Sequence, residues 1–428
     1  MKITLISPYY DVASIGIRIL SSCLKTAGHH TRMVFLPQVR GGYLNDFLIE
    51  ENEKTMNNLI ELCSDSDLIG ITLMTNYFFR VARLTQKLKR ELSQPIIWGG
   101  IHPTIRPREC LQYADMICVG EGEISLVELC NCLEKGLDQS NIKGIWSRRE
   151  GEIINNGTRS LIQDLDSVPY PDYTIDNSFI LEKDYLVPMD YGRLHLSLLR
   201  GMTIDDGKAT YQVITSRGCP LNCSYCSNDI LKRLHGKEKY LRCRSPENVI
   251  KELEDAINKM DFIRGIWISD DCFIYQPTEY LEKYIDLYKK KVNLPFFCLG
   301  DPIHVTREKM NSLCDGGLKL MTMGLQSGSE KTKKLYKRNI SNDKILETTK
   351  IINQFQAKMY PPMYDIIVDN PYESLEDQFE TIKLISKIPR PYYLQLFSLS
   401  FFPETSLYKR AVKDGIITDD YKQIYNKP

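Results

Sequence analysis

The chain has 428 residues, which is enough for two domains with cores of their own. Its 55 lysine and arginine residues balance 55 aspartate and glutamate residues. This balance excludes a broad field that would draw the protein to nucleic acid or to an anionic membrane.

The sequence shows neither a targeting signal nor the cysteine pattern of a disulfide-bonded protein. The first eight residues read as a short apolar strand and not as a signal peptide. No apolar run approaches the ~20 residues needed to cross a bilayer. The 13 cysteines lack the dense pairing of a secreted disulfide scaffold, so we expect a cytoplasmic protein in a reducing compartment.

Residues 1–140 alternate between predicted strands and predicted helices. We expect strands at 2–7, 31–36, 67–73, 95–99 and 116–119, and helices at 15–27, 45–63, 77–92 and 123–135. The alternation favours an α/β fold with a doubly wound, Rossmann-like sheet. Such a sheet binds its ligand beyond the carboxyl ends of its strands.

Glycines, hydroxyls and a few charged residues gather at these predicted strand ends. Glycine lets a bulky ligand approach the backbone, and hydroxyls and free N–H groups bind phosphate or amide groups. Ordinary turn chemistry explains each residue equally well, and for His102 a packed or hydrogen-bonded turn residue is the simpler interpretation. The candidate ligand-binding residues are Ser7, Tyr9, Gly16, Thr72, Thr75, Gly99, Gly100, His102, Gly120, Glu121 and Gly122.

Residues 141–208 are predicted to form a linker. A small hairpin is expected at 140–157, around Glu150 and Gly151. Residues 178–208 carry few periodic cues, so this stretch either bridges the domains or lines a substrate cavity.

Three cysteines follow the strand-like run 211–218 at spacings of four and three: Cys219, Cys223 and Cys226. Thiolates are the usual ligands of iron–sulfur clusters, and three of them leave the fourth iron of a cubane open. A structural zinc site normally needs a fourth ligand, for which Cys243 is the nearest candidate. A disulfide would leave one of the three unpaired.

Residues 209–428 show about six strand–helix units. Strands are predicted near 265–269, 296–299, 319–323, 364–368 and 393–397 after the run at 211–218. This number of units fits a partial β/α barrel, whose active site lies at the carboxyl ends of the strands.

The Cys-x-x-x-Cys-x-x-Cys spacing, with Tyr225 before the last cysteine, resembles the radical S-adenosylmethionine (SAM) superfamily. Together with the N-terminal strand ends and residues 164–173, the chain resembles the cobalamin (B12)-dependent members. The resemblance implies a 4Fe-4S cluster on Cys219, Cys223 and Cys226, with SAM on the open iron and cobalamin in the N-terminal domain. It implies SAM binding by Tyr225, Ser269, Asp270, Asp271, Gln326, Ser327 and Glu330, and leaves Arg242 either as a partner of the SAM carboxylate or in a surface salt bridge.

The sequence departs from the family pattern in three places. Many cobalamin domains carry Asp-x-His-x-x-Gly after the first strand, whereas here Asp11 and Gly16 are present without the histidine. The resemblance then implies a lower cobalt face that is open or touched by a residue that does not ligate. Residues 370–373 and 402–405 replace turns that contain glycine in relatives.

The expected activity is methylation of an unactivated carbon in a small-molecule or natural-product substrate, by way of a deoxyadenosyl radical and methylcobalamin. A flavodoxin or ferredoxin would supply electrons. Radical cyclisation, oxidation or rearrangement without methyl transfer remains open. A methylthiotransferase would need cluster cysteines in the N-terminal domain, where Tyr9 and Tyr10 stand instead, and a non-enzymatic cobalamin sensor would not need an open-iron cluster.

Overall fold

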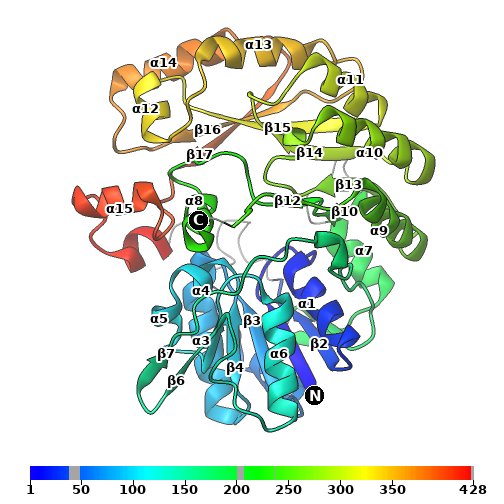
Figure 1. Ribbon diagram of the computed structural model, residues 1–428, viewed down its shortest axis with the longest axis vertical. Coiled ribbons are helices and arrows are strands. Elements are labelled where there is room, and N and C mark those ends of the chain that lie inside the picture. The colour runs from blue at the N-terminus through cyan, green and yellow to red at the C-terminus, as the bar shows by residue number, and fades with distance from the viewer. Residues whose placement is uncertain (38–48, 200–206, 237, 426–428) are drawn as a thin grey trace.

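The computed structural model describes residues 1–37, 49–199, 207–236 and 238–425. It contains a nine-stranded sheet, a six-stranded sheet and a two-stranded ribbon. The ribbon and helix α8 (Ser227–His235) lie between the two larger sheets, so the segment with the three cysteines sits between the two domains (Figure 1). Among the described residues, no helix is both long and apolar enough to cross a membrane.

The N-terminal sheet has the order β7-β6-β5-β4-β3-β1-β2-β8-β9. Its six central strands, from β5 to β8, are parallel, and an antiparallel hairpin extends each edge. The sheet is therefore mixed. The strands are β1 (Lys2–Ser7), β2 (His30–Phe35), β3 (Leu68–Thr72), β4 (Ile96–Gly99), β5 (Met116–Cys118), β6 (Ile145–Arg149), β7 (Glu152–Ile154), β8 (Ser178–Glu182) and β9 (Tyr185–Pro188).

The range 141–208, expected as a linker, supplies four of these strands. The hairpin predicted at 140–157 is present as β6 and β7. The stretch 178–208, for which the sequence left two roles open, contributes β8 and β9 to the sheet. It then forms helix α7, which packs near β10 of the second sheet. Hairpins of this kind are hard to assign to a sheet from sequence, because edge strands have only one neighbour.

Helices cover both faces of the N-terminal sheet (Figure 1). The helix predicted at 45–63 begins only at Glu53, because Asn52 caps it by accepting a hydrogen bond from the Thr55 N–H at 2.9 Å. Residues 45–48 of that prediction lie outside the described residues. The helices are α1 (Ile15–Thr26), α2 (Glu53–Cys63), α3 (Phe78–Glu91), α4 (Ile101–Ile105), α5 (Pro107–Cys110), α6 (Gly122–Glu134) and α7 (Tyr191–Leu199).

The second domain is a half-barrel of six parallel strands in the order β10-β13-β14-β15-β16-β17, as predicted. Helices lie along its outer side, and its inner side faces the cluster segment (Figure 1). The strands are β10 (Ala209–Val213), β13 (Ile263–Ile268), β14 (Phe296–Gly300), β15 (Leu318–Gln326), β16 (Met363–Val368) and β17 (Tyr393–Ser398). The helices are α9 (Pro246–Lys259), α10 (Thr278–Lys291), α11 (Arg307–Asp315), α12 (Glu330–Leu335), α13 (Asn342–Asn353) and α14 (Leu375–Ser386).

The end of the chain returns to the N-terminal domain. Helix α15 (Ser406–Lys413) and the π-helical turn Tyr421–Tyr425 share a buried cluster with side chains of α3 and β4. The Tyr425 hydroxyl donates to the Glu109 carboxylate at 2.7 Å, and Arg106 donates to the Tyr408 hydroxyl at 2.6 Å. These contacts attach the C-terminal end of the second domain to the N-terminal domain.

Arg18 joins helix α1 to the segment that leads toward the barrel. Its fully buried guanidinium donates to the carbonyls of Val12, Ala13 and Asp172 at 2.8–3.0 Å, and it lies 4.1 Å from the ring centre of Tyr173. All three of these hydrogen bonds end on backbone carbonyls, so the side chain holds parts of the backbone that are far apart in the sequence.

We predict that Arg18→Ala lowers the free energy of unfolding by about 3 kcal/mol, because three buried carbonyls lose their donor. Arg149→Ala is the matched control, since Arg149 is exposed at the sheet edge, and it should change stability by less than about 0.5 kcal/mol. Denaturant unfolding checks both variants. Equal effects would contradict the structural role of Arg18.

Candidate functional site

A short ribbon flanks the three cysteines, with β11 (Ser216–Arg217) before them and β12 (Arg242–Cys243) after them. Gly218 follows β11 with a φ of +94°, and a Cβ there would meet the Tyr240 carbonyl oxygen at 2.7 Å. Only glycine fits this approach without strain. The chain can therefore turn from the ribbon directly into Cys219.

Asp270, at the end of β13, binds the start of the ribbon through hydrogen bonds. Its carboxylate accepts hydrogen bonds from the backbone N–H and the hydroxyl of both Thr215 and Ser216, with the Thr215 N–H at 2.6 Å and the Ser216 hydroxyl at 2.6 Å. The side chain is fully buried, and burial raises its pKa although the four hydrogen bonds oppose the shift. Asp270 therefore positions the cluster segment, and its carboxylate oxygens are occupied by the protein itself.

The three cysteines are largely buried, and none forms a disulfide. Arg338 donates to the Cys223 sulfur at 3.6 Å, and Asn228 donates to the Cys226 sulfur at 3.6 Å. Burial raises the pKa of Cys219 to about 12, with a smaller contribution from nearby Asp271. A thiolate at this position therefore requires a neighbouring cation, as a bound metal provides.

The three largely buried thiols on one short segment fit the three-cysteine ligand set of an iron–sulfur cluster. A structural zinc site normally has four ligands.

A cavity of about 460 Å³ lies between the cluster segment and the N-terminal sheet. Ser269 and Asp271 line it from the end of β13, and Asn228 and Tyr240 line it from the cluster segment. Asn228 connects these walls, because it donates to Asp271 at 3.2 Å and accepts from the Tyr240 hydroxyl at 2.6 Å. Burial raises the pKa of Asp271.

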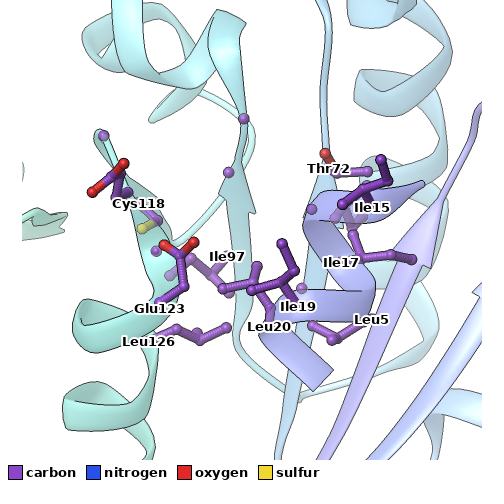
Figure 2. A pocket seen from close by; sticks show the side chains of 18 of the residues that line it. Leu5, Ile15, Ile17, Ile19, Leu20, Thr72, Ile97, Cys118, Glu123 and Leu126 are labelled. Atoms are coloured by element: carbon purple, nitrogen blue, oxygen red, sulfur yellow. The ribbon is translucent and has the colours of Figure 1, made fainter. Parts of the chain in front are cut away.

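A second cavity of about 330 Å³ adjoins the first and enters the N-terminal sheet. Figure 2 shows its apolar side chains, among them Ile15 and Ile19 of α1 and Ile97 of β4. Its lining includes seven of the eleven candidate residues at the strand ends: Gly16, Thr72, Gly99, Gly100, Gly120, Glu121 and Gly122. Both cavities share Gly100, Gly120, Glu121, Ile214 and Arg217.

Glu121 stands where the two cavities meet, and three arginine contacts hold it. Arg217 donates to it at 3.0 Å, and Arg242 donates to both of its oxygens at 2.9 and 3.0 Å. Arg217 also pairs with Glu123. Arg242 is thus neither a surface residue nor free for another carboxylate, and both arginines tie the cluster segment to the end of β5.

The other four candidate residues of the N-terminal domain do not line either cavity. The Ser7 hydroxyl bonds to that of Ser14 at 2.7 Å, and the Tyr9 hydroxyl bonds to that of Thr72 at 3.2 Å. The structure also buries Thr75 and His102, joined by a hydrogen bond of 3.2 Å.

His102 lies in an aromatic environment, 5.1 Å from the ring of Phe78 and 5.2 Å from that of Tyr425. Burial, with a smaller contribution from Arg106, lowers the pKa of His102 to about 3. The imidazole is therefore neutral and packed in the core. The packed and hydrogen-bonded interpretation of His102 is therefore the one that the structure shows.

Three of the residues expected at SAM lie around the end of β15. Gln326 has a φ of +70° and ends the strand, and Ser327 is buried and donates to Glu373 at 3.1 Å. Glu330 points to solvent, with 72% of its side chain exposed beside Lys333, because it occupies the first turn of α12 after the Ser329 cap. Tyr225 packs edge-on against Tyr336, with ring centres 5.0 Å apart.

Sequence reasoning missed three residues that touch the site. Arg338 bridges Cys223 and the Gly324 carbonyl, the latter at 2.7 Å. Arg217 binds Glu121 and Glu123 of the N-terminal domain. His235 lines the larger cavity with a buried Nδ1 that has no hydrogen-bond partner among the described residues. None of the three follows a recognisable motif, so the sequence offers no signal for them.

One other group of metal-type side chains occurs in the described part of the chain. The Cys272 thiol donates to Asp301 at 2.8 Å, and the His304 ring bonds to the same carboxylate at 2.6 Å. Burial and the neighbouring Asp301 raise the pKa of Cys272, so the thiol keeps its proton. The three side chains satisfy one another.

Two family models match the chain: the B12 binding domain over residues 1–130 and the radical SAM superfamily over residues 213–385. The chain belongs to the cobalamin-dependent radical SAM enzymes. This membership brings a 4Fe-4S cluster, SAM and cobalamin as cofactors. The first matched range covers β1 to β5 of the sheet, and the second covers β13 to β16 of the half-barrel.

Characterised and uncharacterised relatives match most of the chain. It is 26% identical to an uncharacterized methyltransferase of Pyrococcus horikoshii, over 82% of this chain and 71% of the relative. It is 22% identical to the bacteriochlorophyllide d C-8(2)-methyltransferase of Chlorobaculum tepidum, over 88% of this chain and 75% of that enzyme.

The fold also matches a solved structure. The radical SAM methyltransferase TsrM of Kitasatospora setae, with tryptophan and a SAM analogue bound, superposes with a TM-score of 0.73 at 14% identity, covering 96% of this chain and 76% of that one. The same order of domains is therefore present in both proteins.

We predict different outcomes for the same substitution at two neighbouring aspartates. Asp270→Asn should lower the free energy of unfolding by about 2–3 kcal/mol and reduce iron uptake, because an amide N–H₂ would face the donors of Thr215 and Ser216. Asp271→Asn should cost less than about 1 kcal/mol, since its side chain lines a cavity. Thermal unfolding and iron analysis after anaerobic reconstitution check this, and equal losses would contradict it.

Proposed function

We propose that this enzyme transfers a methyl group to a carbon atom of a small organic substrate. The observation that carries the proposal is the pair of adjoining cavities, one inside the cobalamin domain and one beside the three cysteines, which meet at Glu121. Relatives named as methyltransferases over more than four fifths of the chain support it.

We assign the cluster to Cys219, Cys223 and Cys226, and the SAM ammonium group to Ser269 and Asp271. A buried carboxylate next to an ammonium group gains a charge-assisted hydrogen bond. The Ser269 hydroxyl has no partner among the described residues and lines the same cavity. Asp270, expected in this role from sequence, serves the ribbon instead.

We assign the buried part of cobalamin to the apolar cavity bordered by Gly16, Gly99 and Gly122. When bound, the cluster and SAM supply a carbon-centred radical, and cobalamin supplies a methyl group. The isoleucines of α1 exclude water from the cavity. Arg217 and Arg242, bound to Glu121, fix the position of one domain relative to the other. A flavodoxin or ferredoxin in the cytoplasm is the proposed electron donor.

A radical reaction without methyl transfer is the second candidate, and one relative supports it. The chain is 30% identical, over 51% of its length, to the anaerobic magnesium-protoporphyrin IX monomethyl ester cyclase of Synechocystis. A radical cyclisation or oxidation without methyl transfer would use the same cofactors. The mass of the product distinguishes the two outcomes, since only methylation adds a methyl increment.

The first test concerns the cluster. Reconstituted wild-type protein should bind about four iron atoms per chain and cleave SAM under reducing conditions. Cys223→Ala should abolish SAM cleavage and remove most of the iron, whereas Cys243→Ser should retain both. SAM with a labelled methyl group then reports transfer, and cleavage without any labelled product would contradict the methyltransferase assignment.

The second test concerns the cobalamin cavity. A Cβ on Gly16 would meet no atom within 4 Å, although Gly16 lines the cavity. We predict that Gly16→Leu fills this space and lowers cobalamin retention by about tenfold or more while iron uptake stays normal. Gly16→Ala is the control with one added methyl group. Absorbance spectra after desalting measure both, and full retention in Gly16→Leu would contradict the assignment.

A further inference from the structure

The inner face of the half-barrel is defined by the alternation of its strands. Ile266 and Ile268 of β13, and Met321 and Met323 of β15, belong to the core packed under the outer helices. The residues between them, Trp267 and Thr322, therefore point to the opposite, concave face. By the same argument, Phe297 of β14 and Asp365 of β16 point there too, since their strand neighbours are in the core.

Three buried polar atoms on this face have no hydrogen-bond partner among the described residues. They are Nε1 of Trp267, Oγ1 of Thr322 and Oδ1 of Asp365. Thr322 is only 6% exposed. Buried polar atoms in native proteins normally have partners, so a cluster of unpaired ones on one concave surface indicates a binding surface.

Asp365 is the charged member of this group. Burial alone raises its pKa to about 6, which means that neither a cation nor a hydrogen-bond donor of the described chain compensates it. At neutral pH most of its population remains ionised. A cationic or N–H-bearing ligand is the chemistry that satisfies such a carboxylate.

An aromatic wall lies on the same face. The rings of Trp267 and Phe297, paired across β13 and β14, are 5.8 Å apart at an angle of 32°. Such a pair offers a flat apolar surface with one indole N–H at its edge. The face thus combines the Asp365 carboxylate on β16 with an aromatic wall on β14 and β13, which lie two and three strands away.

This face is connected to the cluster by one side chain. Arg338 donates both to the Cys223 sulfur and to the Gly324 carbonyl. Gly324 is the register partner of Asp365. Asp365 therefore lies on the strand next to Gly324, whose carbonyl accepts from the same arginine that contacts the Cys223 sulfur.

We infer that the concave face of the half-barrel binds an organic amine, whose ammonium group pairs with Asp365 and whose flat apolar body lies against Trp267 and Phe297. The inference rests on the proposed function, since it names the substrate class of that enzyme. Thr322 supplies a hydroxyl beside the amine.

The test uses the full chain loaded with cluster and cobalamin, and three pairs of probes. Each pair joins an aromatic amine to the alcohol of the same skeleton: tryptamine with tryptophol, phenethylamine with 2-phenylethanol, and 1-naphthylmethylamine with 1-naphthylmethanol. Anaerobic calorimetry at pH 7.5 measures each affinity. We expect at least one amine to bind about tenfold or more tightly than its alcohol.

Asp365→Asn should abolish this preference, whereas Asp286→Asn, an exposed acid on the outer side of α10, should leave it unchanged. Trp267→Leu should weaken amine and alcohol alike. The inference is overturned if no amine exceeds its alcohol, or if the preference survives in Asp365→Asn.

The readouts separate this inference from the proposed function. A protein that takes up cobalamin, cleaves SAM and transfers methyl, but shows no amine preference, refutes only the assignment of Asp365. A protein that prefers amines but transfers no labelled methyl group refutes only the methyltransferase proposal.

Discussion

The buried ion pairs on Glu121 are the contact on which the site depends. A carboxylate at the end of β5 faces Arg217 and Arg242 from the ribbon that leads into the cysteines. Because Arg242 is only 3% exposed, loss of Glu121 would leave a buried positive charge without compensation. The pairs therefore fix the distance between the apolar cavity of the N-terminal sheet and the cluster segment.

The two cavities differ in character, and this difference suits two kinds of ligand group. The cavity inside the N-terminal sheet is walled mainly by isoleucines, leucines and glycines. The cavity beside the cysteines carries Asn228, Asp271, His235 and Tyr240. An apolar recess takes a ligand that reaches deep into a domain, and a polar chamber orients reacting groups.

The half-barrel adds a third surface with its own chemistry. Its helices bury one face of strands β13 to β16, while the concave face keeps a carboxylate oxygen, a hydroxyl and an indole N–H without partners among the described residues. Retaining unpaired polar atoms costs stability, since each buried group without a partner loses its hydration. Such a cost is expected at a functional site and not in a purely structural core.

The sequence determined the order of the elements and the cluster motif. Strand and helix periodicity predicted five strands of the N-terminal sheet and the six-stranded half-barrel, and the spacing of Cys219, Cys223 and Cys226 predicted a cluster segment, because these patterns are local. Only the tertiary structure decided that residues 145–188 extend the first sheet and that the chain end returns to it. It also decided that Asp270 supports the ribbon while Asp271 faces the cavity, and that Arg242 binds Glu121, because these outcomes depend on contacts between residues far apart in the chain.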